Sequence, residues 1–362
     1  MLILVPTSPV RALTRHNYAT GRRCCTLKPC MGHAMTNANR VLRSVVVAAA
    51  SFLSLTVPTC RSQSISPDEY VRAVALNTSG TIQAEVNLDG SLTITENSAK
   101  TQTRLDGLRP TRAFALALSP DGKLLAAADT QGKIQVWDVS TRNLVRTILQ
   151  TAGVWSLAFD SQGNRLAAGG NKAVCVWDLS SGNELHRWPI RDTSTSLSFD
   201  PKGKWLAASD FSVLHLWNLD GDQSLEAKTK DFQIVRVVFS PDGRVVATGG
   251  WGVMKNGAVQ LWKVGDVLAE TTLGVLPNRV EALAFNPDGG SIAAGSPTGM
   301  LKLWSTSNGS ELWTIATDDY IATLAFSGSG RTLVALTGPN QNERAVLLSW
   351  DVQTGKNSDS SR

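Results

Sequence analysis

The chain has 362 residues, of which 42% are hydrophobic and 18% charged, with 30 Gly and 14 Pro. This composition is that of a globular protein and excludes a disordered or collagen-like chain. The formal net charge is +5, but residues 1–67 hold eight Arg or Lys and no acid, so the remainder has 27 basic against 30 acidic residues, a net of −3. Because the basic charge belongs to the N-terminal segment, we expect no nucleic-acid-binding surface on the folded part.

Residues 1–64 are expected to be a basic leader. Arg40 and Arg43 precede an uncharged, mostly apolar run of 14 residues, 44–57. A membrane-spanning helix needs about 20 residues, whereas the apolar region of a secretory signal needs about 7–15. We therefore predict an export signal that begins at Met35 and is cleaved near Ser64, with no stable membrane span, which makes the protein periplasmic or secreted. The alternatives are an organellar transit segment and a cytoplasmic protein.

Four of the five cysteines lie in this leader, and Cys175 is the one in the remainder, so the folded part can hold no internal disulfide. Cys60 follows a Val-Pro-Thr sequence that faintly resembles a bacterial lipid-attachment box. Pro58 and Thr59 fit poorly with the small residues of that box. We therefore do not expect a lipid anchor at Cys60.

From about residue 68 the chain repeats a Gly-ended turn followed by an apolar strand that closes on Trp. The steps between successive turn glycines are 42, 41, 40, 40, 46 and 41 residues. The repeated positions are the glycines Gly80, Gly122, Gly163, Gly203, Gly243, Gly289 and Gly330, and the tryptophans Trp137, Trp177, Trp217, Trp262, Trp304 and Trp350. The first copy has Thr95 in the Trp position. Periods of about 40–45 residues with several short strands indicate propeller blades.

The turns themselves favour hairpins. In Ser-Pro-Asp-Gly, at 119–122 and again at 240–243, Pro fixes its own φ and Gly accepts a positive φ without steric cost. Apolar runs such as 115–118 and 124–127 flank the turn and predict two strands. These runs are nearly continuous, which is typical of sheets covered on both faces.

The seven copies resemble the WD-repeat β-propeller family, of the bacterial, Ser-Pro-Asp-Gly-rich type, over residues 65–354. The resemblance implies an all-β, seven-bladed propeller with four-stranded antiparallel blades, closed into a ring by an N-terminal strand near 62–66. Residues 355–362 are polar and are expected to form a disordered tail. Many family members carry a Gly-His pair before each innermost strand, but here the folded part has only His186 and His215, so blade stability must rest chiefly on the Trp residues.

The resemblance also implies where a partner binds. The start of each innermost strand and the loop between the middle strands lie on the top face of a propeller, and copies five and seven carry longer loops at 249–257 and 338–344. Exposed aromatic and Arg side chains are enriched in binding hot spots. The predicted partner-binding residues are Tyr70, Arg72, Arg112, Phe114, Trp155, Trp251, Met254, Arg279, Glu281 and Tyr320. The alternative is that they only plug the channel mouth or fold over the blade rim.

The sequence shows no nucleophile-elbow serine, no His pair at metal-ligand spacing and no phosphate-binding Gly loop, so we predict no catalytic, cofactor-binding or metal-binding residues. His215 and Cys175 lie within apolar strands and are expected to be packed residues. The predicted function is a monomeric, non-catalytic scaffold that presents one face to a protein or peptide partner. The alternative is an exported propeller enzyme or small-ligand-binding protein, of hydrolase or quinoprotein type, for which the predicted rim offers only Glu281 as a carboxylate.

Overall fold

A computed structural model describes residues 46–48, 71–76, 82–87, 92–96, 101–105, 113–129, 131–150, 153–229, 232–252, 256–337 and 347–357. All of the described strands lie in the unit Val41–Arg362. Every regular element in these residues is a β-strand. None of the described residues forms a helix that is long and apolar enough to cross a membrane.

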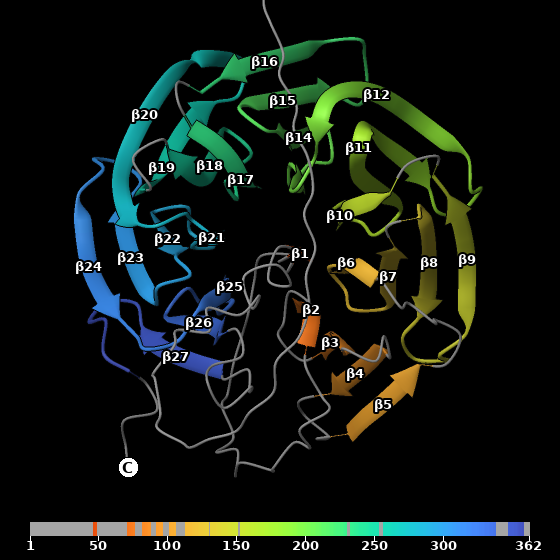
Figure 1. Cartoon of the computed structure of the whole chain (residues 1–362), viewed down its shortest axis with the longest axis horizontal. Coiled ribbons are helices and arrows are strands. Elements are labelled where there is room, and N and C mark those ends of the chain that lie inside the picture. The colour runs from red at the N-terminus through yellow and green to blue at the C-terminus, as the bar shows by residue number, and fades with distance from the viewer. Residues whose placement is uncertain are drawn as a thin grey trace, which may run out of the picture. The chain divides into compact units, whose positions relative to one another are not determined.

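The strands form seven consecutive sheets, which we number as blades 1 to 7 (Figure 1). Blades 1 to 3 contain β2 (Val71–Leu76), β3 (Ile82–Asn87), β4 (Leu92–Glu96) and β5 (Thr101–Leu105); β6 (Ala113–Leu118), β7 (Leu124–Asp129), β8 (Lys133–Asp138) and β9 (Leu144–Leu149); and β10 (Val154–Phe159), β11 (Arg165–Asp178) and β12 (Glu184–Thr193). Blades 4 and 5 contain β13 (Leu197–Phe199), β14 (Trp205–Asp210), β15 (Val213–Asn218) and β16 (Ser224–Lys228); and β17 (Phe232–Phe239), β18 (Val245–Gly252), β19 (Asn256–Lys263) and β20 (Asp266–Pro277). Blades 6 and 7 contain β21 (Ala282–Phe285), β22 (Ser291–Gly295), β23 (Met300–Ser305) and β24 (Glu311–Ala316); and β25 (Ile321–Phe326), β26 (Thr332–Thr337) and β27 (Leu347–Asp351).

Blades 3 and 7 each have three described strands instead of four. In blade 3, β11 supplies both middle strands, because its first half pairs with β10 and its second half pairs with β12. In blade 7, three strands are described, and an isolated antiparallel bridge joins Trp350 to Asn357 beyond the last of them. A further short strand, β1 (Val46–Ala48), pairs in parallel with β6 at Ala115–Ala117.

The innermost strand of each blade contacts the innermost strand of the next, in chain order from β2 to β25. Figure 1 shows these strands turned toward the centre and the fourth strands toward the outside. The predicted all-β, seven-bladed propeller is therefore confirmed. The strand near 62–66 that was expected to close the ring lies outside the described residues, so closure by that strand stays a prediction, as do the domain boundaries.

The repeated turn has the same geometry in each of the six copies that are described. Each turn glycine has a φ between 65° and 74°, and its N–H donates to the carbonyl three residues earlier at 2.8–3.0 Å. This face of the propeller, where the innermost strands end, is called the bottom face below. The turns also meet their neighbours there: Asn286 Nδ2 of blade 6 donates to the Gly330 carbonyl of blade 7 at 3.1 Å.

The Asp of the Trp-Asp ending closes a second turn, between the third and fourth strands. Asp178 Oδ1 accepts the Ser180 hydroxyl at 2.6 Å and the Ser181 N–H at 2.7 Å. These hydrogen bonds to the charged carboxylate lower the pKa of Asp178 to about 2. Asp138 accepts equivalent bonds from the Ser140 hydroxyl and the Thr141 N–H, and Asp351 from the Thr354 hydroxyl and N–H. These bonds also lower the pKa of both carboxyls. The Asp is therefore a turn cap, which explains its place after the Trp.

The hydrophobic core is divided among the interfaces between blades. Trp177 of blade 3 packs in one buried cluster with Ala126, Ile134 and Val136 of blade 2. The other five repeat tryptophans do the same against their preceding blades, so that six clusters join seven blades in the described part of the chain. The six side chains are between 2% and 4% exposed. Each blade therefore buries its faces only when its neighbours are present.

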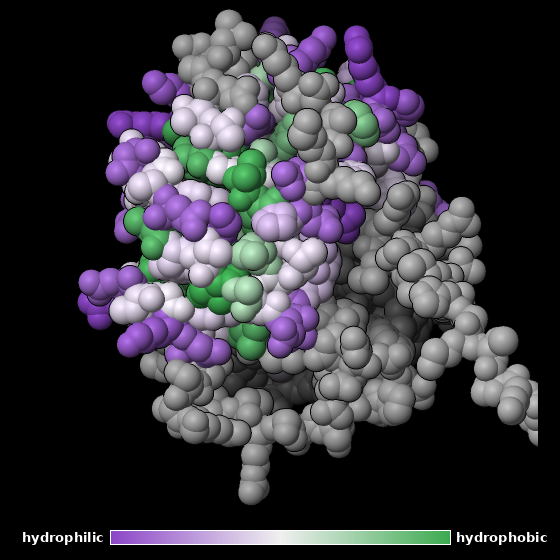
Figure 2. Space-filling model, turned by 60° about the vertical axis from the view of Figure 1, so that its left-hand side comes forward, coloured by the Kyte–Doolittle hydropathy of each residue, from purple (hydrophilic) through white to green (hydrophobic). Residues whose placement is uncertain are grey.

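The outer strands are more polar. Figure 2 shows the side of the molecule that carries β20 and β24, where hydrophobic residues appear as separate patches among hydrophilic ones. Val275 of β20 and Leu312 of β24 are 54% and 51% exposed. Single exposed apolar residues of this kind are ordinary on a protein surface and need no partner.

The contact between turns gives a matched pair of substitutions. Gly289 and Gly330 both have a φ of 71°, but a Cβ at Gly330 would lie 2.3 Å from Asn286 Oδ1, whereas a Cβ at Gly289 has nothing nearer than Pro241 at 3.8 Å. The left-handed backbone costs both alanine variants about 1–2 kcal/mol. Gly330→Ala must also displace Asn286 and its hydrogen bond, worth about 0.5–1.5 kcal/mol. We expect a lower midpoint of urea unfolding for Gly330→Ala than for Gly289→Ala, and equal midpoints would contradict this contact.

Candidate functional site

The face opposite the bottom face, where the innermost strands begin, is called the top face here. Five innermost strands, β2, β6, β10, β17 and β25, have a register shift within their first few residues. The residues skipped by the pairing are Arg72, Phe114, Trp155, Val235 and Ala322. A β-bulge leaves one residue out of the ladder and re-aims its side chain. Three of these five residues, Arg72, Phe114 and Trp155, belong to the predicted partner-binding set.

Trp155 is held at the top face by polar contacts. Its indole Nε1 donates to Asn171 Oδ1 at 3.1 Å, and the Thr193 hydroxyl donates to the same oxygen at 2.7 Å. The indole is only half-buried, while Asn171 is exposed. Trp155 therefore presents part of its ring to solvent in a fixed orientation.

Two further aromatic side chains lie on this face, one on each side of the start of β17. Trp251, at the end of β18, pairs with Gln233 and is 42% exposed. Phe211, in the turn between β14 and β15, is 51% exposed with a φ of 53°, and its carbonyl accepts the Ile234 N–H at 2.7 Å. A positive φ is rare for a bulky residue and marks a local strain. Phe211 was not among the site residues predicted from the sequence. The sequence signal that could have found it is an aromatic residue inside a hairpin turn.

The same face carries a group of charged residues from blades 5 and 6. Glu281 Oε1 lies 3.1 Å from Arg236 Nη2, and Glu281 Oε2 lies 2.5 Å from Arg279 Nε. The residues Arg236 and Glu281 are 8% and 6% exposed. Buried charges need such pairing, because the desolvation of an unpaired ion costs several kcal/mol. Arg236, which lies in a mostly apolar strand, was not predicted.

Tyr320 completes this group. Burial raises the pKa of its hydroxyl, and the Glu281 carboxylate raises it further, so the phenol stays neutral at physiological pH. Burial by itself lowers the pKa of Arg279, but the charge of Glu281 and the contact with Tyr320 outweigh that effect and leave the pKa raised. We call Arg236, Arg279, Glu281 and Tyr320 the top-face charge cluster.

The structure thus brings Arg279, Glu281 and Tyr320 of the predicted set together, and places Trp155 and Trp251 on the same face. Tyr70, Arg112 and Met254 lie outside the described residues, and Arg72 and Phe114 are described through their backbone pairing alone. The longer loop at 338–344 also lies outside them. Whether these residues bind a partner stays a prediction.

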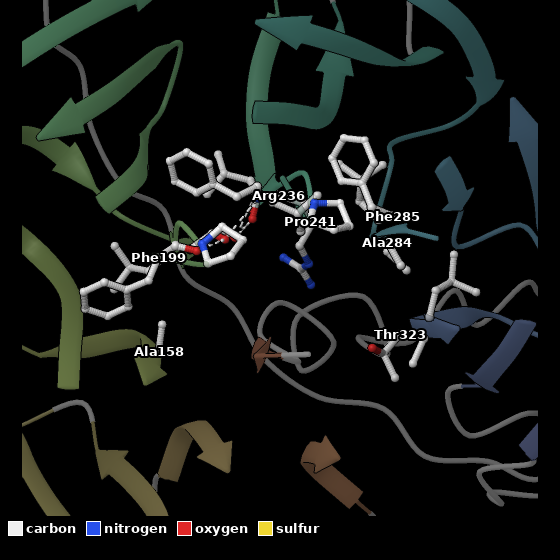
Figure 3. A pocket seen from close by; sticks show the side chains of 18 of the residues that line it. Ala158, Phe199, Arg236, Pro241, Ala284, Phe285 and Thr323 are labelled. Carbon is white, nitrogen blue, oxygen red and sulfur yellow. Dashed lines mark hydrogen bonds between the residues drawn. The ribbon is translucent and has the colours of Figure 1, made fainter. Parts of the chain in front are cut away.

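A cavity of about 380 Å³ lies between the innermost strands (Figure 3). Its walls come from six blades and are mostly apolar, with residues such as Ala158, Phe199, Ala284 and Phe285. Among the described residues that line it, Arg236 is the one basic residue and Asp200 the one acidic residue. The cavity extends from the start of the innermost strands to the bottom-face turns, since Pro201 and Pro241 also line it.

His215 has a structural role. Its Nε2 lies 3.3 Å from Asp210 Oδ2 and its Nδ1 lies 3.3 Å from Glu226 Oε1. Asp210 also accepts the backbone N–H groups of Arg191 and Asp192, near the end of β12 in blade 3, at 2.8 and 2.7 Å. A carboxylate of blade 4 thus holds the preceding blade, in a copy that lacks the family's Gly-His pair.

Four aromatic rings stack in one column across the same interface. His186 and Trp188 of β12 are followed by Trp217 and His215 of β15, with centroid separations of 4.9, 4.6 and 5.1 Å and interplanar angles of 5–7°. Parallel stacking of this kind adds to the energy gained by burial. Both histidines of the folded part are therefore used in packing.

Reactive groups are few in the described part of the chain. Burial raises the pKa of the Cys175 thiol to about 11, so it is protonated at neutral pH and a poor nucleophile. No three His, Cys, Asp or Glu side chains among the described residues are grouped so that they could hold a metal ion. The described residues of this face and of the channel thus form an exposed aromatic surface, a cluster of paired charges and a cavity.

Comparison with known proteins agrees with this architecture. The family "WD domain, G-beta repeat" matches residues 110–138, 142–178, 223–263 and 271–305. The "Small ribosomal subunit protein RACK1" of Caenorhabditis elegans is 28% identical over 122 residues, which cover 33% of this chain and 34% of that protein. The chain thus matches only about a third of the length of this relative.

A solved structure, "Structure of U3-55K", is similar in fold, with a TM-score of 0.65 and 17% sequence identity over 76% of this chain and 90% of that chain. Each family match ends one residue after the repeat Trp of one blade and, in three of the four cases, begins in or beside the outer strand of the blade before it. The sequence repeat is therefore offset from the structural blade. The chain therefore carries WD repeats in four places, within a seven-bladed β-propeller fold.

Proposed function

We propose that this protein is an exported, non-catalytic scaffold that binds a protein or peptide partner through its top face. WD-repeat propellers commonly serve as interaction modules, and the name of the nematode relative describes a component of a larger assembly, the small ribosomal subunit. The fold by itself hosts many functions, so the proposal depends on the site. The proposed export depends on the apolar run at 44–57.

The observation that carries the proposal is the gathering of three accessible aromatic side chains, Trp155, Phe211 and Trp251, on one face of a rigid ring. Aromatic side chains dominate binding hot spots because they bury a large area with few rotatable bonds. Each is positioned by the backbone of an innermost strand or by a side-chain hydrogen bond. A preformed surface loses little conformational entropy when it binds, which raises the affinity.

A site-specific crosslinking experiment tests this face. A photoreactive phenylalanine analogue replaces Phe211 or Trp251 in the full chain, and control proteins carry it at Leu149 or Leu312, which are 75% and 51% exposed on outer strands. We expect one partner to be crosslinked from both top-face positions and from neither control. Crosslinking of the same partner from the controls alone would show that the outer rim is the binding surface.

Affinity measurements with the same partner then test how much the three aromatic side chains contribute to the binding free energy. The triple variant Trp155→Ala, Phe211→Ala, Trp251→Ala should lower its affinity at least about tenfold, because hot-spot aromatics contribute about 2 kcal/mol or more each. The control variant Leu149→Ala, Leu312→Ala should keep the affinity of the unmodified chain, with equal thermal stability for both variants. An unchanged affinity of the triple variant would contradict the proposed surface.

The proposed export has its own test. N-terminal sequencing of the mature protein from its native source should find a start near residue 65, because the segment before it has the features of a secretory signal. A mature protein that retains the apolar run at 44–57 would contradict export by cleavage.

A further inference from the structure

Exposed apolar side chains gather on one outer strand, β9 of blade 2. Leu144, Val145 and Leu149 of this strand are 49%, 51% and 75% exposed. Among the residues whose exposure is described, the outer strands β12, β20 and β24 carry one exposed large hydrophobic residue each. Single residues of this kind are ordinary, whereas three on one strand indicate a surface that meets another molecule.

β9 also ends its sheet. The order of the sheet is β1-β6-β7-β8-β9, so in the described part of the chain no strand follows β9 on its outer side (Figure 1). An edge strand offers backbone N–H and C=O groups to a strand of another chain, and proteins commonly protect such edges with charged side chains or Pro. The only charged residue of β9 is Arg146, whose Nη2 donates to the Ser180 carbonyl of blade 3 at 2.8 Å. This charge is therefore directed to the next blade and leaves the edge without that protection.

The exposed part of β9 is an uncharged stripe. Thr147 and Leu149 lie on one face of the strand and are exposed, whereas Ile148 lies on the other face, in the cluster that joins blades 2 and 3. Val145 is the residue that the ladder with β8 skips, and it is exposed as well. We call Val145, Thr147 and Leu149 the β9 stripe.

The β9 stripe is self-complementary. When two copies of β9 pair in antiparallel orientation about Thr147, each Thr147 lies opposite its own copy and each Val145 lies opposite Leu149 of the second copy. An antiparallel pair of identical strands has a two-fold axis, so the same contact forms twice, as in most homodimers. Apolar and β-branched residues that face each other across two strands stabilise a sheet. In this register Arg146 lies opposite Ile148, so no two charges of β9 meet.

The outer strand of blade 6, β24, offers the nearest comparison. It also has an exposed Thr at its centre, Thr314, and an exposed Leu312 before it. Pairing about Thr314 would set Leu312 opposite Ala316, whose side chain buries much less apolar area. The strand begins with Glu311, whose Oε2 lies 2.8 Å from Lys302 Nζ, so a charged pair lies beside this edge. β9 is therefore the better strand for pairing, and β24 supplies a matched control.

From this arrangement we infer that two copies of the chain pair through β9, antiparallel about Thr147, so that the sheets of two blades join into one. Each copy contributes one short strand, and such an interface is smaller than the roughly 1,200–2,000 Å² of a standard stable one. We therefore expect a weak dimer, with a dissociation constant of about 1–100 µM. The inference replaces the monomer expected from the sequence. It does not depend on the proposed partner, because β9 lies on the outer rim and the aromatic surface lies on the top face.

Sedimentation equilibrium of the full chain, at concentrations up to about 200 µM, tests the inference. We expect the unmodified chain to shift from monomer to dimer over this range. Thr147→Lys places like charges opposite each other at the two-fold axis, so it should raise the dissociation constant at least about tenfold. The control Thr314→Lys puts the same charge at the centre of β24 and should dimerise as the unmodified chain does. A monomeric unmodified chain, an unchanged constant for Thr147→Lys, or loss of the dimer in Thr314→Lys would overturn the inference.

A mixture of oppositely charged variants tests the register. Thr147→Lys and Thr147→Glu should each dimerise poorly alone, whereas an equal mixture should form a heterodimer, because a cation then lies opposite an anion. Recovery of the dimer on mixing also shows that both variants are folded. A mixture that associates no better than either variant alone would overturn the pairing about Thr147.

Crosslinking locates the contact without a change of charge. The photoreactive phenylalanine analogue at Leu149 should join two copies of the chain, a product that its mass distinguishes from a partner complex, and the analogue at Leu312 should give none of it. This measurement keeps the inference falsifiable if a Thr147 variant does not fold. Equal yields of joined copies from the two positions, or none from Leu149, would contradict pairing through β9.

Discussion

The structure depends on the burial of each blade against the one before it. A blade of four short strands has two apolar faces and no core of its own. The repeat Trp of one blade fills the space between that blade and its predecessor, as Trp177 does beside Ile134 and Val136. Because every described interface repeats this contact, the blades are held at fixed positions, and the top face and the channel take their shape from that spacing.

Features with local causes could be predicted from the sequence. The turn glycines adopt a positive φ that other residues avoid, so glycine recurs at the same position of each repeat. The spacing of the Trp residues follows from the length of one blade. Contacts that join distant residues could not be predicted. The pairing of Arg236 with Glu281 spans 45 residues and depends on side-chain direction, which a repeat pattern does not contain. The column from His186 to His215 likewise depends on how two blades meet.

The top face and the channel illustrate how a repeated scaffold gains specific chemistry. Bulges at the start of the innermost strands take single residues out of the ladder, so their side chains vary without loss of sheet pairing. Trp155 uses this freedom for exposed aromatic area, whereas Phe211 lies in the turn between β14 and β15 and Trp251 is paired within β18. Arg236 follows the bulge at Val235, and the result is a guanidinium in an apolar channel.

A double-mutant cycle tests most directly whether packing between blades stabilises the protein. Ile134 lies in the Trp177 cluster, whereas Ile190 lies on blade 3 itself, in the cluster that faces blade 4. Urea unfolding of the single and double variants with Trp177→Phe, Ile134→Ala and Ile190→Ala gives the two coupling energies. We expect a coupling of about 0.5–3 kcal/mol for Trp177 with Ile134, and one within about 0.5 kcal/mol of zero for Trp177 with Ile190. Coupling that is absent across the interface, or equal for both pairs, would contradict the account.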